Sequence, residues 1–210
     1  MNIGIIGPGK MGSGLGRIWA EKGHRIIFSF SRSHEKLNTL ARSVRNGRAG
    51  TPAEAAEASE VILLSVGWAV VKDALQSAGT MQGKILIDCT NPLNADASDL
   101  VIGHTTSGAE EIARLVPGAK VVKAFNTAFA EVYHSGSRLF GSRMPTMFYC
   151  GDDSAAKAVI SKLILEVGFS PVDAGPLNCA RYLEPVAMLM IRLAYVQGMG
   201  TDTALSLIHR

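Results

Sequence analysis

Gly7-Pro8-Gly9-Lys10-Met11-Gly12 stands between an apolar run, Asn2 to Ile6, and a segment with helical spacing that continues through Ile18. Its glycines fit the pattern G-x-G-x-x-G. In that pattern the first glycine permits a tight strand-to-helix turn, the second lets a pyrophosphate approach the backbone, and the third lets the helix pack closely on the sheet. The helix N-terminus adds free N–H groups and a partial positive charge. The stretch therefore predicts a dinucleotide-binding loop.

Three glycines in six residues can also form an ordinary turn, so the context of the motif matters. Here a strand pattern precedes the glycines and a helix pattern follows them. A second strand pattern, Arg25 to Phe30, ends about twenty residues beyond Gly12. These three features favour the dinucleotide-binding interpretation over the simple turn.

Short runs rich in Ile, Val and Leu recur along the chain, and such runs are typical of strands buried on both faces of a parallel sheet. Helical segments separate these runs. The start of one is predicted by an N-cap at Thr51, a proline at N1 at Pro52 and a capping-box partner at Glu54. A second capping box is predicted at Ser107 and Glu110. The alternation predicts an α/β fold, a doubly wound, mostly parallel sheet of the Rossmann type. The expected strands are Asn2–Ile6, Arg25–Phe30, Val61–Ser65, Lys84–Asp88, Lys120–Ala124, Thr146–Cys150 and Ser170–Asp173.

The character of the chain changes from about Asn178 onward. Val186 to Tyr195 is apolar except for Arg192, which predicts a helix covered by protein on several sides. The cover can come from the same chain or from a second copy. We therefore expect a dinucleotide-binding domain at residues 1–177 and a small C-terminal helical region at 178–210, which covers the cleft or forms a homodimer interface.

The end of the second strand bears on which dinucleotide would bind. An NAD site usually has an acidic residue there to accept from the ribose 2'-hydroxyl. The chain instead reads Phe30-Ser31-Arg32-Ser33, in which Arg32 can pair with a 2'-phosphate while Ser31, Ser33 and Lys36 add donors. These residues favour NADP(H). In the alternative interpretation a serine caps the next helix and Arg32 is solvated.

Ligands of a doubly wound sheet lie beyond the carboxyl ends of its strands. Three segments occupy such positions: Ser65-Val66-Gly67-Trp68, Asp88-Cys89-Thr90-Asn91-Pro92-Leu93 and Ala124-Phe125-Asn126-Thr127. Taken singly, Pro92 can simply end a strand, Gly67 can open a turn and Asn126 can cap a helix. Their convergence adds the following residues to the predicted cofactor site: Ser65, Val66, Gly67, Asn91, Pro92, Ala124 and Asn126.

The composition limits the other function classes. The 210 residues suffice for a full core, and the formal charge of +3 comes without the basic cluster that a nucleic-acid surface requires. Cys89, Cys150 and Cys179 are widely spaced, so neither a disulfide framework nor a metal site is expected. The N-terminal residues lack the pattern of a signal peptide or membrane span. We expect a cytoplasmic protein with a small-molecule partner.

Several blocks of the sequence resemble the NADPH-dependent deazaflavin (coenzyme F420) reductases and the oxidoreductase domain of the STEAP metalloreductases. The blocks are Gly4–Gly12, Ser31-Arg32, Thr90-Asn91-Pro92-Leu93, Ser107-Gly108-Ala109-Glu110-Glu111 and Val121-Val122-Lys123-Ala124-Phe125-Asn126-Thr127. The resemblance implies hydride transfer between NADP(H) and F420 or a related flavin, in a cleft between the sheet and the C-terminal helices. Archaeal deazaflavin reductases often have Leu-His-Thr in place of Phe125-Asn126-Thr127, which leaves the acceptor open.

Hydride transfer between two cofactors asks little of the protein beyond alignment of the reacting atoms. In keeping with this, the sequence offers no nucleophile with its base and no carboxylate pair, and we name no catalytic residue. His104 and His134 could donate to an acceptor, although a loop histidine is usually just solvated. Two alternatives remain: reduction of a small imine or carbonyl, as in pyrroline-5-carboxylate reductases, and a non-catalytic NADPH sensor.

Overall fold

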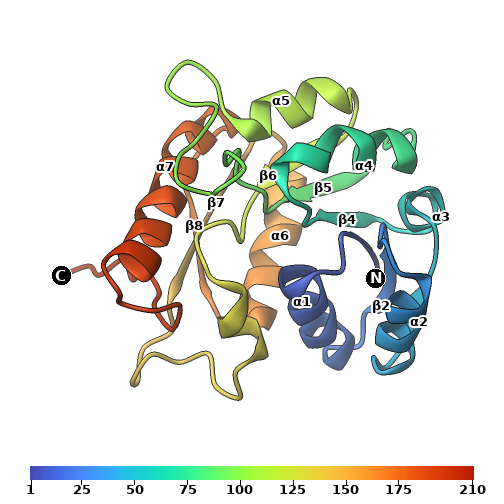
Figure 1. Cartoon of the computed structure of the whole chain (residues 1–210), viewed down its shortest axis with the longest axis horizontal. Coiled ribbons are helices and arrows are strands. Elements are labelled where there is room, and N and C mark those ends of the chain that lie inside the picture. The colour runs from blue at the N-terminus through green and yellow to red at the C-terminus, as the bar shows by residue number, and fades with distance from the viewer.

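An eight-stranded sheet with helices on both faces forms the body of the molecule in the computed structural model, which describes residues 1–210 (Figure 1). The strand order is β3-β2-β1-β4-β5-β6-β7-β8. The strands are β1 (Asn2–Ile6), β2 (Arg25–Ser29), β3 (Gly47–Ala49), β4 (Val61–Leu64), β5 (Ile85–Asp88), β6 (Lys120–Lys123), β7 (Thr146–Gly151) and β8 (Ser170–Asp173).

All neighbouring strands run parallel except β6 and β7, which pair antiparallel through Val122 and Lys123 only. The predicted doubly wound, mostly parallel sheet is therefore confirmed. The order of the first six strands puts the topological switch point between β1 and β4, where ligands of such sheets bind. Strand β3 was not predicted, because Gly47-Arg48-Ala49 has no β-branched or aromatic side chain to signal it.

The helices divide into two layers. One face is covered by α1 (Lys10–Glu21), α2 (His34–Arg42) and α6 (Ser154–Val167), and the other by α3 (Pro52–Glu57), α4 (Val71–Ala78) and α5 (Gly108–Leu115). Helix α7 (Ala180–Ile191) stands at the outer edge beside α5, away from α2 and α3 (Figure 1). Short 3-10 turns η1 (Trp68–Val70), η2 (Ala130–His134) and η3 (Leu177–Cys179) and the π turn η4 (Arg192–Val196) complete the elements.

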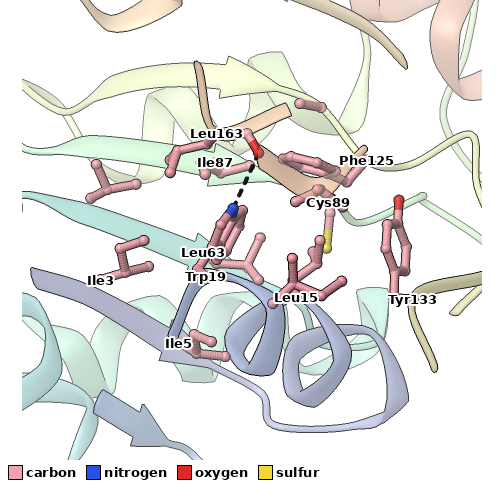
Figure 2. Packing of buried hydrophobic residues seen from close by; sticks show 14 of the residues in the cluster. Ile3, Ile5, Leu15, Trp19, Leu63, Ile87, Cys89, Phe125, Tyr133 and Leu163 are labelled. Atoms are coloured by element: carbon pink, nitrogen blue, oxygen red, sulfur yellow. Dashed lines mark hydrogen bonds between the residues drawn. The ribbon is translucent and has the colours of Figure 1, made fainter. Parts of the chain in front are cut away.

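Trp19 anchors α1 against both the sheet and α6. Its indole N–H donates to the carbonyl oxygen of Leu163 at 3.2 Å, and its ring meets the edge of Phe125 at a centroid distance of 5.7 Å (Figure 2). A buried indole needs such a partner, because an unsatisfied donor in a core is costly. This packing fixes α1, whose other end carries the glycine motif, relative to the sheet and α6.

Two predicted helix starts are present. Thr51 and Glu54 form a full capping box at α3, with Pro52 at the first helical position. At α5, Ser107 accepts from the Glu110 N–H, but the Glu110 carboxylate does not return to the Ser107 backbone. It receives the Ser107 hydroxyl and the guanidinium of Arg181 on α7 instead. The second box is therefore half formed, and α5 gains a link to α7.

Helix α7 is less covered within this chain than its apolar sequence suggested. Leu183 and Ala187 are buried, whereas Leu189 is 56% exposed and Tyr195 of the following π turn is 66% exposed. The expectation of a helix buried on several sides is thus not met within one copy. The boundary at residue 177 stays a prediction. None of the helices combines the length and the apolarity needed to span a membrane.

Candidate functional site

The glycine motif forms the turn from β1 into α1 at the switch point. Gly7 has φ +98°, a conformation that other residues rarely adopt, and its N–H donates to Ser29 of β2 at 3.1 Å. Gly12 faces the turn from inside α1. A Cβ on Gly12 would lie 2.4 Å from the Gly7 carbonyl oxygen and 2.6 Å from Ser65 Oγ. The roles predicted for the first and third glycines, a tight turn and close packing, are those the structure displays.

The N-terminus of α1 is open. Neither backbone nor side chain accepts from the N–H groups of Gly9, Lys10 and Met11, and Gly9 lacks a side-chain cap. A Cβ built on Gly9 would meet nothing within 4 Å. Unpaired N–H groups with free space in front of them and a helix dipole behind them suit a diphosphate. This end of the site fits the dinucleotide that the motif predicts.

Beyond β2 the chain turns at Phe30, whose φ of +59° is unusual for an aromatic residue. Arg32 is exposed and lines a cavity of about 800 Å³, here called the Arg32 pocket, together with Ser31, Val66 and Gly67. Ser33 caps α2 by accepting from the Lys36 N–H at 3.2 Å, and neither residue lines the pocket. The structure brings Arg32 and Ser31 to the cavity, while Ser33 has the capping role of the alternative interpretation.

Two further cavities follow along the strand ends. The central pocket, about 510 Å³, lies between Trp68 and Asn91 and shares Val66 and Gly67 with the Arg32 pocket. The helix pocket, about 580 Å³, lies between Asn126 and α7 and shares Asn91 and Cys89 with the central pocket. The three cavities therefore form one cleft along the carboxyl ends of β2, β1, β4, β5 and β6. Pro8 and the motif glycines line none of the three.

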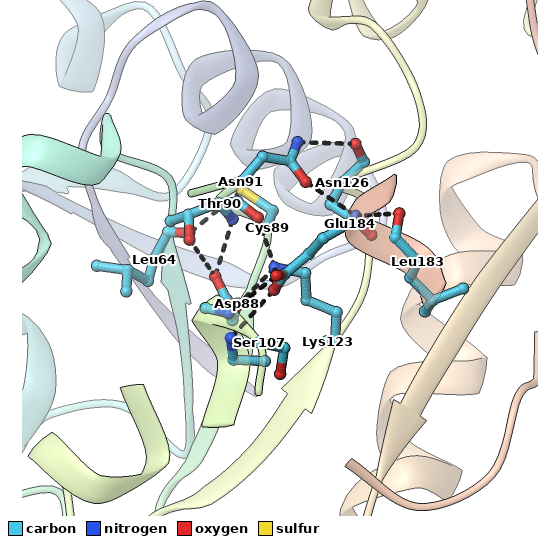
Figure 3. Close-up of polar contacts among 12 residues, drawn as sticks. Leu64, Asp88, Cys89, Thr90, Asn91, Ser107, Lys123, Asn126, Leu183 and Glu184 are labelled. Carbon is cyan, nitrogen blue, oxygen red and sulfur yellow. Dashed lines mark hydrogen bonds and ion pairs between the residues drawn. The ribbon is translucent and has the colours of Figure 1, made fainter. Parts of the chain in front are cut away.

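Asn91 and Asn126 face each other where the central and helix pockets meet (Figure 3). Asn126 Nδ2 donates to Asn91 Oδ1 at 3.0 Å, and Asn91 Nδ2 donates to the Asn126 carbonyl at 3.2 Å. The other two residues predicted on these segments stand back from the cleft. Ala124 is fully buried in the core, and Pro92 packs near Gly108 of α5. They shape the strand ends and do not line the cleft.

Backbone strain marks the exit of β6 as well as that of β2. Phe125 has φ +65° and is completely buried between Trp19 and Tyr133. A bulky residue in this conformation persists only where the surrounding packing holds it. Phe125 thus turns the chain so that Asn126 and Thr127 reach the helix pocket.

The cleft contains no nucleophile ready for use. Burial raises the pKa of the Cys89 thiol far above its ordinary value, and its Sγ lies 3.2 Å from the Leu64 carbonyl as a donor. His134 contacts the glycine motif through its ring, with Nε2 2.8 Å from the Lys10 carbonyl oxygen. His104 lines none of the three pockets. No three His, Cys, Asp or Glu side chains gather in a way that could hold a metal ion.

A buried ionic network beside the cleft was not predicted. Lys123 at the end of β6 lies 2.9 Å from Asp88 at the end of β5 and 2.9 Å from Glu184 of α7, and all three are at most 1% exposed (Figure 3). Burial opposes the charge of Lys123, but the two facing carboxylates outweigh it and raise the pKa of this ammonium. The available signal was a charged residue between apolar neighbours in each of two segments, at Lys123 and at Glu184.

The apolar wall of the helix pocket was also missed. Phe129 and Tyr195 line it and pack edge to face at 6.0 Å, and Met188 of α7 lies among the same lining residues. Phe129 follows β6 by several residues, and Tyr195 lies in the π turn. Sequence reasoning had no reason to pair them, because their contact depends on where α7 docks.

The turn at Gly7, the open helix N-terminus and the cleft at the switch point define a dinucleotide-binding protein of the Rossmann type. Residues 2–92 match the family model described as "NADP oxidoreductase coenzyme F420-dependent". Over this segment the chain is similar to the F420-dependent NADP oxidoreductases, as the resemblance of its sequence blocks predicted.

Curated proteins extend the likeness beyond that segment. The metalloreductase STEAP3 of Rattus norvegicus is 30% identical over 189 residues, which make up 90% of this chain and 37% of that protein. The metalloreductase STEAP2 of Homo sapiens is 30% identical over 111 residues, 53% of this chain and 21% of that protein. The chain thus spans well under half the length of these relatives.

Solved structures agree on the fold. A protein from Arthrobacter sp. FB24, described as a candidate F420-dependent NADP reductase, superposes with a TM-score of 0.89 at 27% identity over 100% of both chains. A reductive aminase from Aspergillus terreus in complex with NADPH and ethyl-5-oxohexanoate has a TM-score of 0.68 at 20% identity, covering 94% of this chain and 63% of that one. The second likeness shows the fold alone. Together the comparisons support an NADP-dependent oxidoreductase.

Proposed function

We propose that this protein is an NADPH-dependent oxidoreductase that transfers a hydride between NADP(H) and a deazaflavin (F420) or a related flavin. The observation that carries the proposal is the continuity of the cleft. The Arg32 pocket, the open end of α1 and the central pocket line up as sites for the two halves of a dinucleotide. The helix pocket then leaves room for a second ligand next to them.

Each part of the dinucleotide has a counterpart in the cleft. Arg32 would pair with the 2'-phosphate, and the N–H groups of Gly9, Lys10 and Met11 would hold the pyrophosphate. The nicotinamide would then reach the central pocket between Trp68 and Asn91. The order of the three cavities along the strand ends supports this placement of the dinucleotide. No single contact does so alone.

The helix pocket suits a planar, largely apolar ring system. Phe129, Tyr195 and Met188 give it aromatic and thioether surfaces, while Asn91 and Asn126 give it amide groups at one end. When bound, NADPH supplies a hydride from the nicotinamide C4 to the acceptor ring. The residues of this chain bind and align the two ligands and keep water away, and this requires no acid or base from the protein.

A direct test follows NADPH absorbance while a deazaflavin, FMN, FAD, a ferric chelate and pyrroline carboxylate are offered in turn. The proposal predicts fastest turnover with the deazaflavin or a flavin. Turnover with the imine alone would favour the pyrroline-5-carboxylate reductase type of reaction. Tight NADPH binding with no turnover on any acceptor would favour an NADPH sensor.

We also infer that two copies of the chain associate through the exposed side of α7. Tyr182 and Leu189 stand seven residues apart on α7, and Val196 at the end of the following π turn continues this spacing. Each of the three is more than half exposed. Apolar side chains at this spacing form one stripe, which a second helix can cover.

The three unpaired cysteines suit a reducing compartment such as the cytoplasm.

Light scattering with size-exclusion chromatography tests the association. Leu189→Glu should convert a dimer into a monomer, because it puts a charge in the middle of the stripe. Leu165→Glu is the matched control, since Leu165 is 52% exposed on α6, a different element. A wild-type monomer at all concentrations, or a dimer unaffected by Leu189→Glu, would refute the inference.

A further inference from the structure

The buried network of Asp88, Lys123 and Glu184 contacts residues that line the cleft. Besides its two ion pairs, the Lys123 ammonium donates to the carbonyl oxygen of Thr90, which lines the central pocket. Asp88 accepts from both the N–H and the hydroxyl of Thr90, at 2.8 Å each. We propose that Glu184 is a positioning residue, which through this network holds α7 where hydride transfer to the second ligand requires it; the inference rests on the proposed function.

Glu184 joins α7 to α5. Its two carboxylate oxygens accept from the N–H groups of Gly108 at 2.8 Å and Ala109 at 3.1 Å, the first two residues of α5. A Cβ on Gly108 would lie 3.2 Å from Glu184 Oε1 and 3.1 Å from the Trp68 ring. The glycine therefore allows the carboxylate to approach the helix N-terminus, whose partial positive charge offsets the excess negative charge of the network.

The neighbouring residue ties α7 to the other side of the cleft. The Leu183 carbonyl accepts from Asn126 Nδ2 at 3.1 Å, and the same amide group donates to Asn91 (Figure 3). Two adjacent residues of α7 thus fix it to the segments that follow β5 and β6 and to the start of α5. The segments after β5 and β6 border the central and helix pockets.

Farther along α7, the positions of the pocket-lining residues follow from this attachment. Met188 and Ile191 line the helix pocket and stand four and seven residues beyond Glu184, on the same side of the helix. A shift of the attachment would move both side chains relative to Asn126. Hydride transfer is sensitive to such shifts, because a displacement of about 1 Å can cost about a hundredfold in rate.

Loss of the charge at residue 184 cannot be absorbed by the surroundings. A Glu184→Gln amide would direct its NH2 group at either the Lys123 ammonium or the N–H groups of α5, and all of these are donors. Replacing a whole buried ion network by apolar residues is often neutral for stability, so such a network is weak evidence for a purely stabilising role. Its hydrogen bonds to Thr90 and to the first two N–H groups of α5 point to positioning instead.

The test compares Glu184→Gln with Glu184→Asp and with the control Glu166→Gln, which removes a carboxylate that pairs with His24 at 2.8 Å on other elements. For Glu184→Gln we expect the Kd of NADPH, read from NADPH fluorescence, to stay within about threefold. The kcat/KM for the deazaflavin or flavin should fall by about ten- to a hundredfold. Hydrogen exchange of residues 187–196 should become faster, with Glu184→Asp intermediate and Glu166→Gln unchanged.

Two outcomes would overturn the inference. One is a folded Glu184→Gln protein with wild-type exchange at 187–196 and wild-type acceptor kinetics. The other is an equal loss of NADPH affinity and acceptor turnover, which would mean general destabilisation. If Glu184→Gln does not fold, Glu184→Asp decides the matter with the same readouts. Failure of the wild-type chain to bind NADPH or reduce any acceptor would instead refute the proposed function, and with it the inference.

Discussion

Gly12 lies so close to Gly7 that a Cβ on Gly12 would stand 2.4 Å from the Gly7 carbonyl oxygen. Gly9, between them in the same motif, has empty space where its side chain would be. This difference separates the structural role of Gly12 from the ligand-binding role proposed for Gly9. Gly12 is needed for the packing of α1 on the strand ends, whereas Gly9 leaves room in front of the helix N-terminus.

Substitutions at the two glycines should therefore have opposite signatures. Gly12→Ala should destabilise the fold by about 1 to 3 kcal/mol, because the methyl group meets backbone and cannot be relieved by a rotamer change. Gly9→Ala should leave the unfolding midpoint nearly unchanged and weaken NADPH at least about tenfold, because its methyl group occupies the phosphate approach. Thermal unfolding and fluorescence titration measure both, and a Gly9→Ala protein with normal NADPH affinity would contradict the placement of the pyrophosphate.

Arg32 should determine the preference for NADPH over NADH. Removing its guanidinium in Arg32→Ala takes away one charge-assisted contact to the 2'-phosphate, so NADPH affinity should fall by about tenfold to a hundredfold. NADH affinity should change little. Arg42→Ala, at the far end of α2 and outside the Arg32 pocket, serves as the control. Equal losses for both cofactors in isothermal titration would show that Arg32 does not contact the 2'-phosphate.

The ion pair between Glu110 of α5 and Arg181 of α7 should make the free energy of unfolding depend on pH. The side-chain hydrogen bond from Arg181 is the largest influence on the Glu110 carboxyl and holds its pKa below the ordinary value of 4.5. A depressed pKa means that the ionised carboxylate stabilises the fold above about pH 4.5, and that this contribution is lost as pH falls through the folded-state pKa.

Arg181→Met should accordingly lower the Tm by about 1 to 3 °C at pH 7, and by progressively less as the pH falls below 4.5. Arg42→Met, which removes an arginine with no carboxylate partner, should show no such pH dependence. A Tm difference between wild type and Arg181→Met that is constant from pH 7 to about pH 3 would mean that Glu110 contributes nothing through its charge.

The sequence allowed accurate prediction of several features that depend on neighbours along the chain. The glycine turn, the strand ends and the Thr51 cap are local features, and each lies where its pattern predicts. Arg32 also reaches the cleft, because the position after the second strand is dictated by the fold type. The remaining site residues proposed from the strand ends are still predictions as ligand contacts.

Other features depend on docking between distant elements and left only faint signals. Lys123 and Glu184 are 61 residues apart by number, and each alone suggests only a charge in an apolar segment. The positive φ of Phe125 arises from packing against Trp19 and Tyr133, which no local pattern indicates. The exposed side of α7 was missed because an apolar helix sequence does not reveal how much of it the same chain covers.

The most direct test of the central claim uses NADPH carrying deuterium on one face of the nicotinamide C4, with an oxidised deazaflavin as acceptor. The C4–deuterium bond breaks, a carbon–deuterium bond forms at C5 of the deazaflavin, and solvent supplies the proton that completes the reduction. Mass spectrometry and NMR of the product should show deuterium at C5 from one labelled face and none from the other. Product without the label from either face, or label acquired only from D2O, would contradict direct hydride transfer in this cleft.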